Sequence, residues 1–284
     1  MWSEWGKAIR EWAHQGRPGA CAPPRIGLAL GGGFARSLAH VGVLQAFEQH
    51  QIPLHAIAGI SSGAIIASTY ASGTPLEEII STGACTTFSS YARWTLSRLG
   101  LATNERMGPW LRRALRHTRF EEMRTPLAVV ATDLVSGAPV VFKDRGDIIL
   151  PVRASCAYPG LFQPVEINGR WLVDGAISVI LPVDALLEMG ATHVVAVYLH
   201  TISVNGSRPA NMLQVVSQCF AILQDGMVGD WRRRARLVLE PSVNSFAWDD
   251  FGRVEDLVRA GREAALAALP TIKRWFEAPA SRAA

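Results

Sequence analysis

Short apolar runs alternate with longer segments of helical periodicity along most of the chain. Buried strands are predicted at 26–30, 54–58, 126–134, 140–142, directly before Asp174, at 193–199 and at 235–241. Helices are predicted at 36–50, 63–71, 106–117, 183–190, 213–227 and 253–278. The stretch 148–160 predicts a further helix followed by a turn at Pro159-Gly160. Strands that alternate with helices favour a mostly parallel sheet covered on both faces, so we expect a three-layer α/β/α fold.

Three segments need a separate interpretation. Residues 85–104 are polar and aromatic with poor periodicity, and they predict a lid or a mobile loop. Thr74 is expected to cap the following helix, with Pro75 at its first position. Residues 49–76 contain no Asp, Glu, Lys or Arg and would be long enough to span a membrane. Pro53 and several glycines in that stretch favour a buried strand, a turn and a helix instead.

The N-terminal region, residues 1–24, is predicted to be an amphipathic helix (1–16) and a linker, followed by one large domain at 25–284. Trp2, Trp5 and Trp12 fall on one helical face, and charged residues occupy the place where a signal peptide would need an apolar core. This aromatic face could contact a membrane interface, or it could pack on the protein itself or on a partner chain. The pattern does not distinguish these alternatives.

Composition adds few constraints. The chain has 284 residues, 49% hydrophobic and 18% charged, with a net charge of +4, which is typical of a globular protein. Its four cysteines are far apart and form no metal-ligating pair, so reduced thiols and a cytoplasmic location are expected. The arginine clusters are not interleaved with aromatic residues, and nucleic acid is therefore not a predicted partner.

The central chemical motif is Gly59-Ile60-Ser61-Ser62-Gly63, which matches G-x-S-x-G. It lies between a predicted strand and a predicted helix, the context that a nucleophile elbow requires. The helix N-terminus that follows would favour developing negative charge. Ser61 is therefore the candidate nucleophile, although a glycine–serine turn without catalytic function would show the same local pattern.

A second glycine-rich turn, Gly31-Gly32-Gly33-Phe34-Ala35-Arg36, follows the first predicted strand. A dinucleotide-binding loop would need glycine where Arg36 stands and an acidic residue after the next strand, and both are missing. The alternative is an oxyanion hole, in which backbone amides of the turn bind the oxygen of a tetrahedral intermediate. The presence of the nucleophile motif favours this alternative.

The base that would activate Ser61 has two possible arrangements. Asp174, followed by Gly175 and Ala176, comes directly after a predicted strand and could accept the proton itself. A Ser–Asp–His triad would instead need a histidine after the aspartate, and His200 is the only plausible candidate. The dyad is the simpler interpretation.

Five segments occur in an order that resembles the bacterial patatin-like phospholipases: GLALGGGFARSLAHVGVLQ, GISSGAI, ATDLVSGAPVVF, RASCAYPGLFQPV and LVDGAISVILPVDALLEMGA. The resemblance, with its signature at about 27–187, implies a Ser61–Asp174 dyad. It also implies an oxyanion hole from Gly32, Gly33 and Phe34, supported by Arg36. Lipid esters are the implied substrates, and no cofactor or metal is implied.

The sequence departs from the pattern of that family at three places. Phe34 and Ser37 stand where glycines are usual, and Val179-Ile180 replaces an asparagine pair. If position 34 requires a positive φ, a phenylalanine there is strained. These departures motivate one rival to the dyad hydrolase, a catalytically weak lipid-binding protein. His200 leaves a second rival, an α/β-hydrolase-type esterase with a Ser–Asp–His triad.

Overall fold

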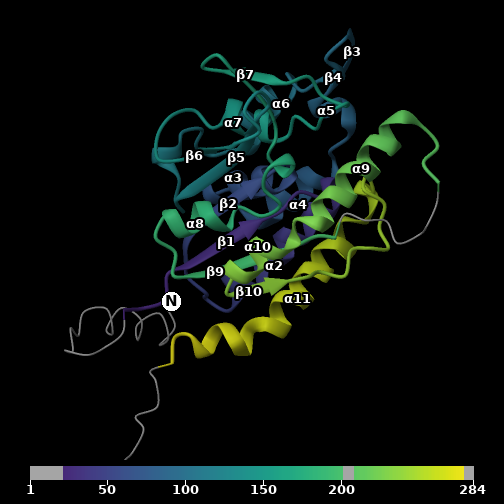
Figure 1. Ribbon diagram of the computed structural model, residues 1–284. Coiled ribbons are helices and arrows are strands. Elements are labelled where there is room, and N and C mark those ends of the chain that lie inside the picture. Colours follow the sequence, from purple (N-terminus) through teal and green to yellow (C-terminus); the bar gives the residue numbers. More distant parts are fainter. Residues whose placement is uncertain (1–21, 201–207, 278–284) are drawn as a thin grey trace, which may run out of the picture.

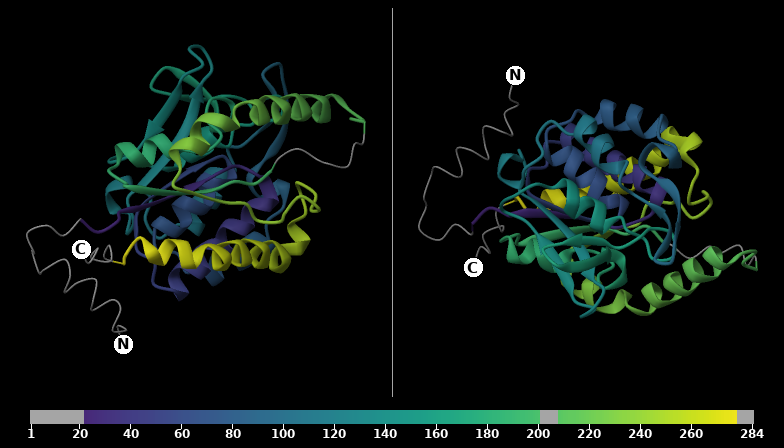
Figure 2. Two further views of the ribbon diagram at one scale, coloured as in Figure 1. Left: turned by 60° about the horizontal axis from the view of Figure 1, so that its bottom comes forward. Right: turned by 90° about the horizontal axis from the view of Figure 1, so that it is seen from above.

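The computed structural model describes residues 22–200 and 208–277. The predicted N-terminal helix lies outside these residues. The described chain forms a central sheet between two layers of helices (Figures 1 and 2). The expected three-layer α/β architecture is confirmed.

Five strands form the parallel part of the sheet, in the order β10 (Leu237–Leu239), β9 (His193–Val197), β1 (Ile26–Leu30), β2 (Leu54–Ile60) and β5 (Leu127–Asp133). Three more strands run antiparallel to their neighbours: β6 (Pro139–Phe142), β7 (Val165–Ile167) and β8 (Arg170–Asp174). Both β6 and β8 pair with β5. The parallel prediction therefore holds for the part of the sheet that carries the glycine loop and Ser61.

The two faces of the parallel strands differ in the size of their side chains. One face carries large side chains, such as Leu28 and Ile57, against α2 (Ala39–Gln49), α3 (Ser62–Ala71), α4 (Leu76–Ala84) and α11 (Val254–Arg274). The other carries alanines, such as Ala29 and Ala58, against α8 (Val183–Glu188), with α10 (Val228–Arg234) beside it. Because successive residues of a strand point to opposite faces, this alternation fixes the register of each strand.

The strands β2 and β8 meet end to end along one edge of β5. Residues 129–132 of β5 pair with β6 on one edge, so β2, which reaches Val130, and β8, which begins at Ala131, share the other edge. Ile60 is the partner of Val130, and Asp174 is the partner of Ala131. Since β8 runs opposite to β2, the carboxyl ends of both strands arrive at the same point.

The segment 85–104 differs from the expected lid or mobile loop. It forms α5 (Phe88–Tyr91) and a hairpin of β3 (Arg93–Ser97) and β4 (Gly100–Thr103). The ring of Phe88 stacks on Phe162 with centroids 6.0 Å apart, and the Ala102 amide donates to the Leu161 carbonyl at 2.8 Å. Contacts with a distant part of the chain fix this segment, and sequence periodicity does not report such contacts.

The predicted helix cap at Thr74 is wrong. The Thr74 hydroxyl donates to the Ala114 carbonyl at 2.8 Å, and Pro75 occupies the cap position of α4.

The stretch 49–76, which contains no Asp, Glu, Lys or Arg, forms β2 and α3, as predicted. The remaining helices are α6 (Met107–Ala114), α7 (Ile149–Ser155) and α9 (Met212–Gly226). None of the described helices is long and apolar enough to cross a membrane.

Candidate active site

Ser61 lies at the turn between β2 and α3, with φ 53° and ψ −134°. Few residues other than glycine adopt a positive φ, so this backbone is strained, as expected of a nucleophile elbow. Gly63 allows the turn to pass close to the glycine loop, because a Cβ there would lie 2.4 Å from the Gly31 carbonyl oxygen. The sequence around Ser61 thus permits a tight turn that a larger residue at position 63 would prevent.

Ser155, at the end of α7, holds the strained turn in place. The Ser61 amide donates to the Ser155 hydroxyl at 2.8 Å, and that hydroxyl donates to the Val130 carbonyl at 2.7 Å. Ser155 is completely buried. Sequence reasoning missed this residue, because it lies 94 positions from Ser61 and is only a small polar residue on a predicted helix.

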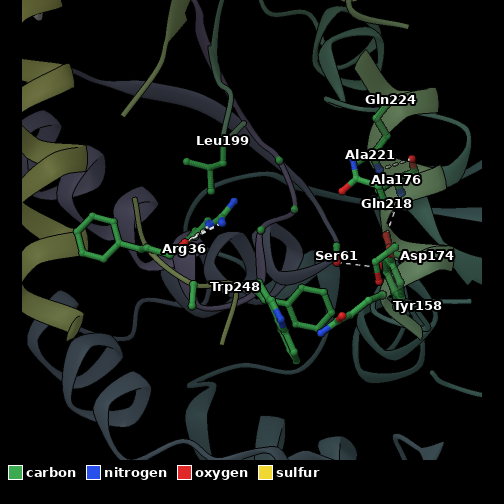
Figure 3. A pocket seen from close by; sticks show the side chains of 18 of the residues that line it. Arg36, Ser61, Tyr158, Asp174, Ala176, Leu199, Gln218, Ala221, Gln224 and Trp248 are labelled. Atoms are coloured by element: carbon green, nitrogen blue, oxygen red, sulfur yellow. Dashed lines mark hydrogen bonds between the residues drawn. The ribbon is translucent and has the colours of Figure 1, made fainter. Parts of the chain in front are cut away.

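Asp174 and Ser61 are in direct contact (Figure 3). The Ser61 hydroxyl donates to Asp174 Oδ2 at 2.7 Å, and the Ala176 amide donates to Oδ1 at 2.9 Å. Asp174 is only 1% exposed, and its burial raises the pKa from 3.8 to about 7, against the opposing effect of these two hydrogen bonds. The carboxyl group therefore titrates near neutral pH, where a general base is most effective.

The glycine loop approaches Ser61 from β1. A Cβ on Gly32 would lie 3.0 Å from Ser61 Cβ, so this loop is in contact with the candidate nucleophile. The Gly33 amide donates to the Ser62 hydroxyl at 3.0 Å, and Ser62 is hydrogen-bonded in turn to Ser37. Within the described residues, the Gly32 amide donates to no protein acceptor. Ser37, one of the departures, thus takes part in holding the loop.

Phe34 has a φ of 51°, so the strain considered for this position is present. Its ring packs edge to face against Trp248, with centroids 5.0 Å apart, and against Tyr158, at 5.7 Å. Such aromatic pairs are worth about 0.5–1.5 kcal/mol each beyond their buried area, which offsets backbone strain of similar size. The phenylalanine therefore forms an aromatic wall of the site.

Arg36 and His40 support the glycine loop from behind. The buried Arg36 guanidinium donates from Nε and Nη2 to the Phe246 carbonyl and from Nη1 to the His200 carbonyl. His40 Nε2 donates to the Gly31 carbonyl at 2.8 Å. Burial lowers the His40 pKa to about 4, so the ring is neutral at pH 7. Sequence reasoning missed His40, whose one signal was a polar residue on an otherwise apolar face of its helix.

The structure does not bring His200 into contact with Asp174. The His200 ring faces Glu240, with Nε2 and Oε1 3.8 Å apart, and its side chain is 40% exposed. Both Asp174 oxygens already accept hydrogen bonds, from Ser61 and Ala176. The arrangement is therefore a serine–aspartate pair.

Two cavities meet at Ser61 and Phe34. The larger, about 850 Å³, is bounded by the glycine loop, α9 and the loop that carries Trp248. The smaller, about 100 Å³, lies between α3, α4 and α6. Its lining is mostly apolar and includes Leu38, Ile65, Ile66, Ile79, Met107 and Trp110. A ligand bound at Ser61 thus meets a large open space on one side and a narrow apolar space on the other.

Comparison with known proteins identifies the family. The family described as patatin-like phospholipase matches residues 28–187, more than half of the chain. The chain belongs to this family.

Two relatives and one solved structure illustrate the similarity. An NTE family protein of Mycobacterium tuberculosis is 34% identical over 190 residues, 66% of this chain and 52% of that protein. Lysophospholipase NTE1 of Cryptococcus neoformans is 32% identical over 181 residues, 61% of this chain and 11% of that protein. The chain thus spans about half the length of the first of these relatives and a small part of the second. Human GIVD cytosolic phospholipase A2, solved with a fluorophosphonate inhibitor, shares the fold with a TM-score of 0.53 and 12% identity, covering 95% of this chain and 61% of that one.

Proposed function

We propose that the protein hydrolyses the carboxylic ester bonds of lipids, with Ser61 as nucleophile and Asp174 as general base. The observation that carries this proposal is the 2.7 Å hydrogen bond from the Ser61 hydroxyl to Asp174, at the point where the two cavities meet. The similarity to lysophospholipase NTE1 and membership of the patatin-like phospholipase family support a lipid ester as the substrate.

In the proposed reaction, Ser61 Oγ attacks the ester carbonyl carbon while its proton passes to Asp174 Oδ2. The tetrahedral intermediate collapses, the C–O bond to the alcohol breaks, and the alcohol leaves with the proton from Asp174. Water then attacks the acyl-serine, and Asp174 accepts a proton from it. Collapse of the second intermediate breaks the bond to Ser61 Oγ, which recovers its proton from Asp174 as the fatty acid leaves.

The Gly32 amide is the main donor to the oxyanion in this proposal. It adjoins Ser61 and is not committed to another described acceptor, whereas the Gly33 amide already donates to Ser62. Removing one donor of this kind costs about 3 kcal/mol in barrier height. Phe34 and Arg36 act on the loop itself, by aromatic packing and by hydrogen bonds to two backbone carbonyls.

The two cavities suggest how a lipid would lie. The narrow apolar cavity suits the acyl chain, because its lining offers few hydrogen-bond partners. The larger cavity suits the glycerol and headgroup, since the amides of Gln214, Gln218 and Gln224 line it. Phospholipids and lysophospholipids have both an apolar and a polar part, and they match this division.

A fluorophosphonate probe together with hydrolysis of lysophospholipid and phospholipid tests the proposal. Wild-type protein is expected to be labelled and active, and Ser61→Ala to be neither. Asp174→Asn should lose activity by a factor on the order of 10² to 10⁴, the usual contribution of a general base. Ser81→Ala, at an exposed serine of α4, is the matched control and should behave as wild type. Labelling or hydrolysis that survives in Ser61→Ala would exclude Ser61 as nucleophile, and a wild type that neither reacts nor hydrolyses would favour a lipid-binding protein.

A further inference from the structure

Helix α9 carries glutamines on the side that faces the larger cavity and large apolar side chains on the side that faces water. Gln214, Gln218 and Gln224 face the larger cavity, and Gln224 donates to the Ala176 carbonyl beside the dyad at 3.0 Å (Figure 3). The outward side instead carries Met212, Val215, Ile222 and Leu223, each between 48% and 70% exposed. A helix of a soluble protein normally presents its polar face to water. This apolar stripe therefore indicates contact with something other than water.

The tip of the β3–β4 hairpin has the same character. Trp94, Leu96, Leu99 and Leu101 are all exposed, and Leu96 is completely so. Arg98 lies in the turn between the two strands, and Arg93, at the base of the hairpin, forms an ion pair with Glu105 at 3.8 Å. Exposed leucines beside basic residues are typical of segments that enter the boundary between headgroups and acyl chains.

The β3–β4 hairpin and α9 lie on the same side of the molecule. Figures 1 and 2 show the hairpin and α9 projecting from that side, away from α11. Each adjoins one of the cavities that meet at Ser61: α9 lines the larger, and Tyr91, two residues before β3, lines the smaller. A flat apolar phase that touched both elements would therefore lie at the entrance to the site.

We propose that the outward stripe of α9 and the β3–β4 hairpin dock the protein on an anionic phospholipid surface. The apolar side chains enter the interface, and Arg98, in the turn of the hairpin, contacts a lipid phosphate. Residues 209–224 of the α9 segment contain no charged residue, so burial of this stripe in the interface removes no charge from water. The proposal rests on the proposed function only in the choice of a lipid partner.

Cosedimentation with vesicles of phosphatidylcholine and phosphatidylglycerol tests the docking surface. All proteins carry Ser61→Ala, so that the lipid is not consumed. Ile222→Glu and Leu96→Glu should each weaken vesicle partitioning about tenfold or more, because each removes a large apolar side chain from the interface and adds a negative charge. Leu266→Glu, at an exposed position of α11 on the other side of the molecule, is the matched control and should bind as the parent does.

Hydrolysis by the same variants in the Ser61 background separates this proposal from the proposed function. Hydrolysis of a water-soluble short-chain ester should be unchanged by Ile222→Glu and Leu96→Glu, while hydrolysis of vesicle lipid falls with binding. If no ester is hydrolysed but vesicle binding still depends on Ile222 and Leu96, the docking surface stands and the proposed function fails. Equal vesicle binding by all variants would overturn the docking surface. A change from dimer to monomer in Ile222→Glu with unchanged vesicle binding would also overturn it, because a second copy would then cover the stripe.

Discussion

The free energy of unfolding should depend on the ionisation of Asp174. Burial raises the pKa of this carboxyl from 3.8 to about 7. Between pH 3.8 and about pH 7, the folded protein therefore holds a proton that the unfolded chain has already released. Each unit of difference corresponds to about 1.36 kcal/mol, so keeping the carboxylate ionised in the fold above pH 7 costs about 4 kcal/mol. The contribution of Asp174 to stability is thus greatest below pH 3.8 and is lost as the pH rises through about 7.

Asp174→Asn removes this dependence, because the amide is neutral at every pH and nearly equal in size. Relative to wild type, the variant should gain about 3 kcal/mol of stability between pH 5 and pH 8. Urea denaturation of both proteins at several pH values, followed by circular dichroism, measures this difference. Groups that do not interact with Asp174 titrate alike in both proteins and cancel from the comparison. Asp184→Asn, at an exposed aspartate of α8, is the control for the same substitution at the surface.

A difference in stability between Asp174→Asn and wild type that stays constant from pH 5 to pH 8 would refute the reasoning. It would mean that Asp174 has the same proton affinity in the folded and unfolded states. The wild-type carboxyl would then be an ordinary ionised aspartate, and the argument that burial prepares it as a base near neutral pH would fail.

Three further predictions concern activity. With a water-soluble ester, kcat/KM should rise as the pH increases through about 7 and then level off, because Asp174 must lose its proton to act as a base. Ser155→Ala leaves the buried Ser61 amide without its acceptor, so kcat should fall with little change in KM, and urea denaturation should show a loss of about 1–3 kcal/mol. Thr82→Phe should fill part of the narrow cavity and lower kcat/KM about tenfold for long-chain p-nitrophenyl esters but not for short-chain ones.

Each of these has an outcome that would contradict it. A pH profile that is flat through pH 7 would argue against Asp174 as the base. A Ser155→Ala protein with normal kcat would show that the turn keeps its geometry without this hydroxyl, for which Ser155→Thr is the control. An equal loss on long and short esters in Thr82→Phe would indicate general damage to the site and would place the acyl chain elsewhere.

The sequence was sufficient for those parts of the fold that local pattern determines. Strands such as β1 and β9 are continuous apolar runs because helices cover both sides of the sheet, and such runs are recognisable in isolation. The β3–β4 hairpin was not predicted, since its position depends on the Phe88–Phe162 stack and on the hydrogen bond from Ala102 to Leu161, far along the chain. The prediction of a cap at Thr74 failed for the same reason, because its hydroxyl donates to the carbonyl of Ala114, 40 residues away.

The residues of the candidate site likewise fall into those that local sequence identifies and those that depend on tertiary contacts. Ser61, Asp174 and the glycine loop were identified because each follows a strand and forms part of a compact motif. Ser155 and His40 were not, although one fixes the Ser61 amide and the other the Gly31 carbonyl. Both are single polar residues on helices, and their function depends on which backbone group the fold places opposite them.

In the proposed dyad, the topology of the sheet removes the need for a histidine between Ser61 and Asp174. Because β8 runs against β2 along the same edge of β5, the fold delivers the aspartate directly to the serine hydroxyl. An exposed aspartate would be too weak a base at its ordinary pKa of 3.8, but the burial that this meeting imposes raises the value to about 7. That is close to the 6.5 or so of a free histidine. In that proposal, burial at the strand ends gives Asp174 a proton affinity close to that of the imidazole in a triad, and substrate reaches the pair through the two cavities that meet at Ser61.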